Sequence, residues 1–230
     1  MFYEVDQYAQ SFRYFSGEVR YSQIDWSNLD QIVDSYGQRI QDWYLGPAKE
    51  LAKNWDFAFS VMALNCLLID TLSQFVAGIE SSRSDEFKEF IRNRLPSTYS
   101  CKLKTPIRHN DGRKDKKGKF KEELLKDVAD ALYHGFRCGI LHQAHIPLYC
   151  GVAQEANPVR EAPGHVKYKD SRTCCPSIIV NPLALLKDLE ETFEAYLRDL
   201  KDRDPKNDQL RANFKEKFSS SFGVDVNIAT

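Results

Sequence analysis

Apolar residues recur at intervals of three and four along most of the chain, which is the period of a helix that buries one face. The cleanest pattern spans residues 57–79 and is apolar on several sides, so it predicts a central, buried helix. A second pattern spans residues 29–51, with Ser27 or Asn28 as its N-cap. Gly46-Pro47 predicts a kink or restart, because proline removes a backbone donor.

Further helices are predicted on both sides of the chain's middle. A short helix begins at Ser84, and a helix of about 18 residues is predicted from Phe120 into Arg137. Asn181-Pro182 is typical of a helix start, and this helix ends at Asp204-Pro205, before a weaker helix over residues 207–218. The predicted fold is all-α, an up-and-down bundle of five or six helices.

Two segments interrupt this helical pattern. Residues 96–118 are predicted to form a loop, and residues 147–177 an irregular insertion that is rich in turn signals. Within and just after that insertion, residues 165–168 and 177–180 could pair as a small β-hairpin. The insertion is therefore expected to be irregular or to contain the hairpin.

Residues 1–26 form an aromatic-rich N-terminal segment without a clear period. The bundle is assigned to residues 27–203, and a C-terminal helix and tail to residues 204–230. So many rings are expected either to cover the helical core or to face a partner chain, with the first reading favoured. The aromatic residues concerned are Phe2, Tyr3, Tyr8, Phe12, Tyr14, Phe15, Tyr21 and Trp26.

The composition, 42% hydrophobic and 28% charged residues, is typical of a soluble globular protein. A formal net charge of −1 excludes a global field that would recruit nucleic acid or a membrane, so any such attraction must be local. The first ten residues do not resemble a secretory signal, and the apolar run at residues 61–69 is too short for a membrane span. The six cysteines lack a CxxC pair and are interpreted as free thiols of a cytoplasmic protein.

One local concentration of positive charge lies in the predicted loop. Nine cations between residues 102 and 121 face only Asp111 and Asp115. The segment is either a solvated loop or a contact for the phosphates of RNA, since lysine attracts phosphate without regard to sequence. The candidate RNA-binding residues are Lys102, Lys104, Arg108, Arg113, Lys114, Lys116, Lys117, Lys119 and Lys121.

The most compact candidate chemistry lies in residues 131–147, which read ALYHGFRCGILHQAHIP. Arg137 and His142 have apolar neighbours, and Gly135 and Gly139 predict a bend or helix junction around them. An imidazole exchanges a proton near neutral pH, and a guanidinium binds a phosphate and stabilises charge on it. These groups supply about half of what metal-free RNA cleavage needs, and a two-fold dimer would supply the rest.

A helical bundle with a central apolar helix and Arg-x4-His after a long helix resembles the HEPN superfamily. The later segment SIIVNPLALLKDLEETFEAYL resembles its final bundle helix. The resemblance covers roughly residues 28–203 and is strongest at 120–145 and 178–200. It implies an all-α dimer that is often a metal-independent ribonuclease of toxin–antitoxin, antiphage or RNA-processing systems. In that family a catalytic arginine and histidine converge across the dimer axis, and they correspond to Arg137 and His142 in this sequence.

The chain departs from the family at the residue after the arginine, which is Cys138 rather than the Asn or Asp of many active members. Cys138 could instead act as a nucleophile with His142, and His145 could line a metal site with His142 and His134. The nucleophile pair lacks a third group to orient it, and the metal site lacks a carboxylate or other fourth ligand at a recognisable spacing. Arg137 and His142 could also simply cap helix ends.

Asp70 is an additional supporting candidate. It lies either on the polar side of the predicted central helix, the reading favoured, or inward, where it would pair with Arg137 or orient His142. The leading hypothesis is a cytoplasmic, dimeric, HEPN-like endoribonuclease without metal or cofactor, paired with itself or with a partner such as an antitoxin. The alternative is a non-catalytic HEPN-like module that binds RNA, a nucleotide or a partner protein, with the aromatic N-terminus as its contact surface.

Overall fold

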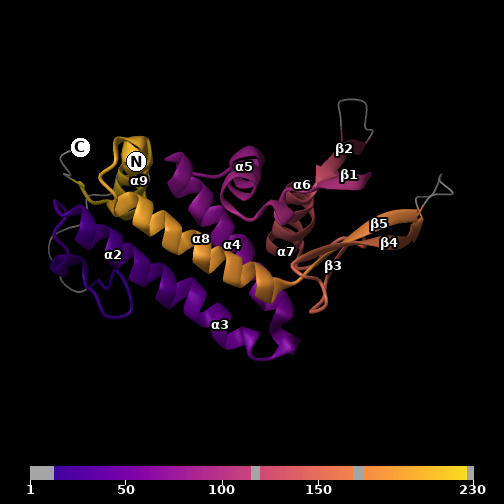
Figure 1. Ribbon diagram of the computed structural model, residues 1–230, viewed down its shortest axis with the longest axis horizontal. Coiled ribbons are helices and arrows are strands. Elements are labelled where there is room, and N and C mark those ends of the chain that lie inside the picture. Colours follow the sequence, from indigo (N-terminus) through magenta and orange to yellow (C-terminus); the bar gives the residue numbers. More distant parts are fainter. Residues whose placement is uncertain (1–12, 115–119, 168–173, 227–230) are drawn as a thin grey trace.

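The computed structural model describes residues 13–114, 120–167 and 174–226, with side chains of 110–122 and 163–175 outside the description. The protein is mostly helical and elongated, with its long helices side by side and its strands gathered at one end (Figure 1). The coarse prediction of a helical bundle is confirmed. The finer prediction of an all-α fold is wrong, because two small sheets adjoin the helices at that end.

The first long helical stretch follows the predicted boundaries closely. It consists of α2 (Leu29–Ile40), a π-helical turn η2 (Gln41–Leu45) and α3 (Gly46–Ala52). Asn28 is the N-cap and accepts a hydrogen bond from the Gln31 amide. The predicted disturbance at Gly46-Pro47 is therefore confirmed as a π-turn that joins two α-helices.

Helix α4 (Ala58–Ala77) is the central element, preceded by a short 3-10 turn η3 (Trp55–Phe57). It packs against α3, against the next helix, α5 (Ser84–Arg94), and against the last two helices, α8 (Pro182–Lys201) and α9 (Asp208–Phe222). Its buried residues include Val61, Leu68 and Leu72. Gly78 ends it in the left-handed conformation. Helix α5 begins and ends as predicted, before the 3-10 turn η4 (Ser97–Tyr99).

The predicted loop over residues 96–118 and the predicted helix from Phe120 are both wrong. In their place β1 (Lys102–Lys114) and β2 (Phe120–Asp127) form an antiparallel hairpin. The apolar spacing after Phe120 suits a helix, but Leu125 is buried opposite Ile107 while Leu124 is exposed. This alternation is that of a strand that buries one face.

The helix that carries Arg137 thus begins at Val128, eight residues later than predicted from Phe120. It consists of α6 (Val128–Ala131), a π-helical turn η5 (Leu132–Arg137) and α7 (Cys138–Gln143). The Asp127 side chain is the N-cap and accepts from the Asp130 amide at 2.8 Å. The junction predicted around the glycines is confirmed, since η5 gives way to α7 after Arg137.

A β-hairpin forms in and after the insertion as predicted, but the predicted pairing of residues 165–168 with 177–180 is wrong. β4 (Val159–Lys167) and β5 (Cys174–Val180) pair antiparallel, so that residues 177–180 lie opposite 159–162. β3 (Cys150–Val152) adds a parallel strand on the other side of β5. This three-stranded sheet and the β1–β2 hairpin lie beside α6 and α7 (Figure 1), so the helix that carries the candidate site lies between the strands and the bundle.

The last helices return along the bundle. Helix α8 (Pro182–Lys201) starts as predicted, because the Asn181 side chain accepts from the amides of Leu183 and Ala184. A 3-10 turn η6 (Pro205–Asn207) follows, and α9 (Asp208–Phe222) completes the bundle. Helix α9 extends four residues beyond the predicted end at residue 218.

The N-terminal aromatic segment packs intramolecularly where the structure describes it. After the 3-10 turn η1 (Tyr21–Gln23), Trp26 joins Phe15, and both rings contact Phe218 of α9. Phe15 is fully buried. The aromatic residues Phe2, Tyr3, Tyr8 and Phe12 lie outside the described residues. The described rings, apart from the exposed Tyr14, cover the core and do not form a contact surface.

The helical stretch Trp55–Ala77 is long and apolar enough to cross a membrane, which the run at residues 61–69 alone did not suggest. Half of its most apolar window is buried inside the protein. A core helix of a soluble protein passes the same test, so this is weak evidence for a membrane span.

Candidate functional site

The structure brings Asp70 of α4, Arg137 of η5 and His142 of α7 into one contact chain. Arg137 Nε and Nη2 donate to Asp70 Oδ1 at 3.3 and 3.1 Å. Arg137 Nη1 lies 2.9 Å from His142 Nε2. The Asp70 and Arg137 side chains are only 17% and 16% exposed, so the favoured solvent-facing reading of Asp70 is wrong and its alternative, pairing with Arg137, is found.

The contact between Arg137 and His142 fits one tautomer of the imidazole. A guanidinium has only donors, so a hydrogen bond between them requires His142 Nε2 to accept, with the ring proton on Nδ1. Asp70 is held in turn by Ser82, whose hydroxyl donates to Oδ1 at 2.6 Å. Burial alone would lower the pKa of Arg137, but Asp70, Cys138 and Tyr133 together more than offset it, so the pKa is raised and the guanidinium stays charged.

Arg137 and His142 open onto a cleft with a volume of about 650 Å³, between the α6–α7 helix, the β1–β2 hairpin and the loop before β3. Cys138, His145 and the ring of Tyr133 also line it. The full lining is His109, Tyr133, His134, Arg137, Cys138, Gly139, His142, Gln143, His145, Pro147 and Tyr149.

Two further titratable side chains, Tyr133 and Cys66, lie near Arg137. The Tyr133 ring lies 5.7 Å from the Arg137 guanidinium carbon. Burial, followed by the neighbouring Cys138, raises the pKa of the Tyr133 hydroxyl, which therefore stays protonated near neutral pH. Burial also raises the pKa of the Cys66 thiol, on the adjacent face of α4. Of these three side chains, only Arg137 carries a charge near neutral pH, and it lines the cleft.

The sequence left other roles open for these residues. The described hydrogen-bond partner of His142 is Arg137, which gives no support to a Cys138–His142 nucleophile pair. Within residues 13–114, 120–167 and 174–226, no three His, Cys, Asp or Glu residues are arranged to hold a metal, so His134, His142 and His145 form no such site there. Helix capping also fails for Arg137, since its guanidinium binds Asp70 and α7 ends at the left-handed Ala144.

The basic candidates whose side chains the structure describes do not line the cleft. Lys102, Lys104 and Arg108 are exposed on β1, and none of the three lines the cleft. The backbones of Arg113, Lys114 and Lys121 lie in the hairpin strands, while Lys116, Lys117 and Lys119 lie outside the described residues. The hairpin therefore presents its described cations beside the cleft rather than inside it.

Sequence reasoning missed the opposite wall of the cleft. His109 falls in the segment 96–118 that was predicted to be a loop, and Tyr149 was not singled out. In the structure the Tyr149 hydroxyl lies 2.5 Å from His109 Nδ1. One signal was available, because Leu103 and Ile107 lie at alternate positions among the cations of residues 102–108, in the way that a strand with one buried face does.

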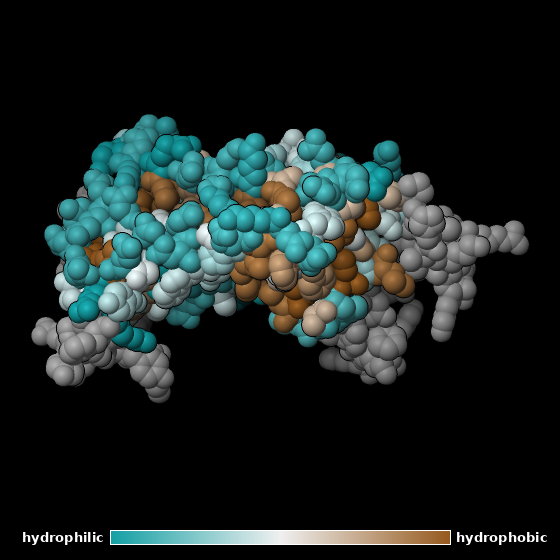
Figure 2. Space-filling model, turned by 90° about the horizontal axis from the view of Figure 1, so that it is seen from below, coloured by the Kyte–Doolittle hydropathy of each residue, from teal (hydrophilic) through white to brown (hydrophobic). Residues whose placement is uncertain are grey.

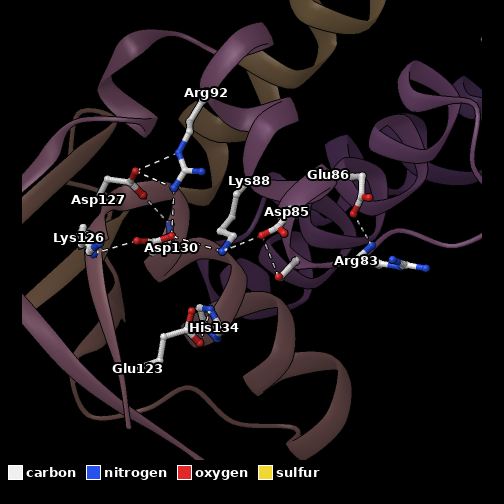
Figure 3. Close-up of polar contacts among 11 residues, drawn as sticks. Arg83, Asp85, Glu86, Lys88, Arg92, Glu123, Lys126, Asp127, Asp130 and His134 are labelled. Carbon is white, nitrogen blue, oxygen red and sulfur yellow. Dashed lines mark hydrogen bonds and ion pairs between the residues drawn. The ribbon is translucent and has the colours of Figure 1, made fainter.

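A charged network fixes the start of the site-bearing helix. Arg92 of α5 donates to the carboxylates of Asp127 and Asp130 at 2.8 and 3.0 Å (Figure 3). Lys88 Nζ lies 3.7 Å from Asp130 on the same side. These contacts tie the first turn of α6 to α5, so the helix that presents Arg137 has a fixed position.

No family model, curated protein or solved structure matches this chain. The geometry of the cleft is therefore the basis for a functional proposal.

Proposed function

We propose that this protein is a HEPN-like, metal-independent endoribonuclease in which Arg137 binds the scissile phosphate and His142 transfers protons. The observation that carries the proposal is the 2.9 Å contact between Arg137 Nη1 and His142 Nε2 at the wall of a cleft. A fixed cation beside a neutral imidazole suits a phosphate and the hydroxyl that attacks it.

The reaction would proceed by internal transfer. His142 Nε2 accepts the proton of the 2′-hydroxyl, whose oxygen forms a bond to the adjacent phosphorus while the bond to the 5′-oxygen breaks. The leaving oxygen takes up a proton, and the products are a 2′,3′-cyclic phosphate and a 5′-hydroxyl. Arg137 stabilises the negative charge that develops on the phosphoryl oxygens.

Asp70 is a positioning residue in this scheme. It holds two guanidinium nitrogens through Oδ1, which leaves Nη1 directed at His142. A bound phosphate would compete for Nη1 and release His142 Nε2 to accept a proton. Substrate binding and activation of the base are thereby linked through one guanidinium.

A second copy of the chain supplies the acid that one site lacks. An apolar stripe on α4, consisting of Phe59, Ala63, Leu64 and Leu67, is left partly uncovered and leads along the helix to Asp70. A two-fold contact through this stripe would bring two Arg137–His142 pairs toward each other. We therefore propose a cytoplasmic homodimer, with a partner or antitoxin as the alternative occupant, in a toxin–antitoxin, antiphage or RNA-processing role.

A non-catalytic binding module is the second candidate. It is favoured by three exposed aromatic residues close together in sequence at the start of α4, Trp55, Phe57 and Phe59. Apolar residues occupy part of the underside of the molecule (Figure 2). Exposed aromatic residues of this kind would bind a partner protein without needing Arg137 or His142.

The deciding experiment incubates purified protein with labelled RNA in EDTA. We expect the wild type to cleave and to leave 2′,3′-cyclic phosphate ends, and the Arg137→Ala/His142→Ala variant to lose about 10²-fold or more in rate, as expected for loss of a proton-transfer group and a charge stabiliser. The comparison is made between wild-type and variant proteins that are both folded and equally dimeric, so that the loss of rate reflects the two side chains.

Arg203→Ala is the matched control. Arg203 is an exposed arginine paired with Asp30, away from the cleft, so its removal should leave the cleavage rate unchanged. Absence of cleavage by the folded, dimeric wild type would favour the binding module.

A further inference from the structure

The half of the cleft opposite Arg137 and His142 is built from aromatic rings. The His109 ring lies 5.1 Å from the His134 ring and 5.9 Å from the Tyr149 ring, centroid to centroid. Tyr133, whose ring lies next to Arg137, connects the two halves at 4.9 Å from His134. The two walls of one cleft therefore differ in kind, since one has a charged guanidinium and the other has tilted and edge-on rings.

These rings are held in place by elements that are distant in sequence. His109 lies in β1 opposite Glu123 of β2, on the hairpin face that also buries Ile107. The backbone carbonyl of Tyr149 accepts from the Ile178 amide at 2.8 Å, which anchors the loop to β5. The Tyr149 hydroxyl then fixes the His109 ring through Nδ1. The aromatic wall is thus preorganised before any ligand arrives.

His134 lies behind this wall. It is only 7% exposed, and its Nε2 atom is buried 3.3 Å from the Glu123 carboxylate (Figure 3). Burial lowers the pKa of His134, so the ring is neutral near pH 7 and adds no positive charge that would hold a second phosphate in this half of the cleft.

The size of the cleft points to the same kind of ligand. Its volume of about 650 Å³ lies within the range of about 300–1,000 Å³ that is typical of small-molecule sites. One phosphate at Arg137 would leave most of this space unfilled. A nucleoside attached to that phosphate would extend toward the rings.

Building on the proposed function, we propose that His109, His134 and Tyr149 form a subsite for the nucleobase next to the scissile phosphate of RNA. The base stacks on the Tyr149 ring, the nearly perpendicular His109 ring meets the base edge-on, and the neutral His134 ring closes the subsite behind His109. Stacking on aromatic side chains is how proteins generally hold single-stranded bases, and it tolerates different bases because each has a π-face.

The test measures base-dependent binding, which does not require cleavage. A fluorescein-labelled 2′-O-methyl hexa-adenylate cannot react, because its 2′-oxygens are blocked, and an abasic hexamer has the same backbone. We expect the wild type to bind the first about tenfold more tightly by fluorescence anisotropy, the size of one base stack. Tyr149→Leu should remove this ratio, whereas Tyr149→Phe keeps the ring and should retain it.

Two controls separate this subsite from the phosphate site. Leu148→Ala changes the neighbouring side chain, which is 78% exposed and not part of the cleft lining, and should leave both affinities unchanged. Arg137→Ala should weaken both hexamers by the same factor, because a phosphate contact does not depend on the base.

The outcomes distinguish the two proposals. If RNA is not cleaved but the base-dependent ratio exists and depends on Tyr149, the nuclease proposal fails and the subsite stands. If RNA is cleaved but wild type binds both hexamers equally, or Tyr149→Leu weakens both equally, the subsite is overturned and the nuclease remains. Failure of the wild type to bind either hexamer also overturns the subsite.

Discussion

At the scale of single residues, the Arg137 guanidinium is divided between a carboxylate and an imidazole. Asp70 takes the Nε and Nη2 donors, and His142 takes Nη1. An arginine this well shielded from water needs a counter-charge, and Asp70 supplies it from another helix. The same ion pair that makes the burial of Arg137 tolerable also aims it at the cleft.

Asp70→Asn tests this double role. The amide keeps the size of the side chain but removes the charge, so we expect the free energy of unfolding to fall by about 1–3 kcal/mol, as for a buried charge that loses its partner. RNA cleavage should fall by about tenfold, because the guanidinium loses its orientation. Urea denaturation and the cleavage assay measure the two effects.

Asp34→Asn is the appropriate comparison for that variant. Asp34 also pairs with a cation, Lys201, but its side chain is 68% exposed, so the change in unfolding free energy should stay within about 0.5 kcal/mol. If Asp70→Asn leaves the cleavage rate unchanged, Asp70 has no positioning role.

At the scale of elements, the helix from Val128 to Gln143 decides what the cleft can contain. Its first turn is tied to α5 by Arg92, and its π-turn η5 places Arg137 toward Asp70. Gly135, in that turn, lets the start of β3 approach closely, because a Cβ there would overlap Sγ of Cys150, the first residue of β3. The two walls of the cleft therefore lie this close together only because glycine has no Cβ at position 135.

Gly135→Ala should force this helix and the start of β3 apart. We expect the free energy of unfolding to fall by about 1–3 kcal/mol, the usual cost of overpacking, with a shift in the urea midpoint as the measurement. A Gly135→Ala/Cys150→Ala double variant should recover part of the loss, because it removes the overlapping sulfur.

The control for this substitution is Gly37→Ala in α2. Its new Cβ would meet only the tip of the Leu197 side chain, at 2.9 Å, which can move. Alanine is also favoured over glycine in a helix by up to about 1 kcal/mol, so this variant should be neutral or more stable. Equal destabilisation by both substitutions would contradict the close packing assigned to Gly135.

The elements also show where apolar spacing is ambiguous. The spacing of Phe120, Leu124 and Val128 fits a helix, yet residues 120–127 form a strand. Periodicity over eight residues does not separate the two, and pairing with β1 decided the outcome. The pattern of α4 was long, and α8 also had a cap signal at its start and a stop signal after its end, so for both helices the predicted and observed elements agree.

At the scale of the whole molecule, the partly uncovered stripe on α4 is where the proposed dimer contact would form. Leu67 is 38% exposed and lies one helical turn before Asp70 in the uncovered stripe. A second copy seated on this stripe would cover apolar surface and bring the two candidate sites together. The proposed dimer therefore predicts that a substitution that disrupts this contact surface removes both dimer formation and RNA cleavage.

Leu67→Glu should separate the proposed dimer, because each copy would bring a charge into an apolar contact. We expect a monomer by light scattering, native-like circular dichroism and a cleavage rate at least about tenfold below wild type. Leu124→Glu makes the same change at an exposed position of the hairpin and should leave mass and rate unchanged. A dimeric Leu67→Glu protein would place the interface elsewhere.

The sequence by itself determined the long helices and the presence of Arg137 and His142 within one turn and a half of each other. Both follow from local spacing, since periodicity and caps act over a few residues. Only the tertiary structure decided that Asp70 holds Arg137 and that His109 and Tyr149 form the opposite wall. These contacts join residues 67 and 40 positions apart, and such proximity results from packing and strand pairing rather than from any local pattern.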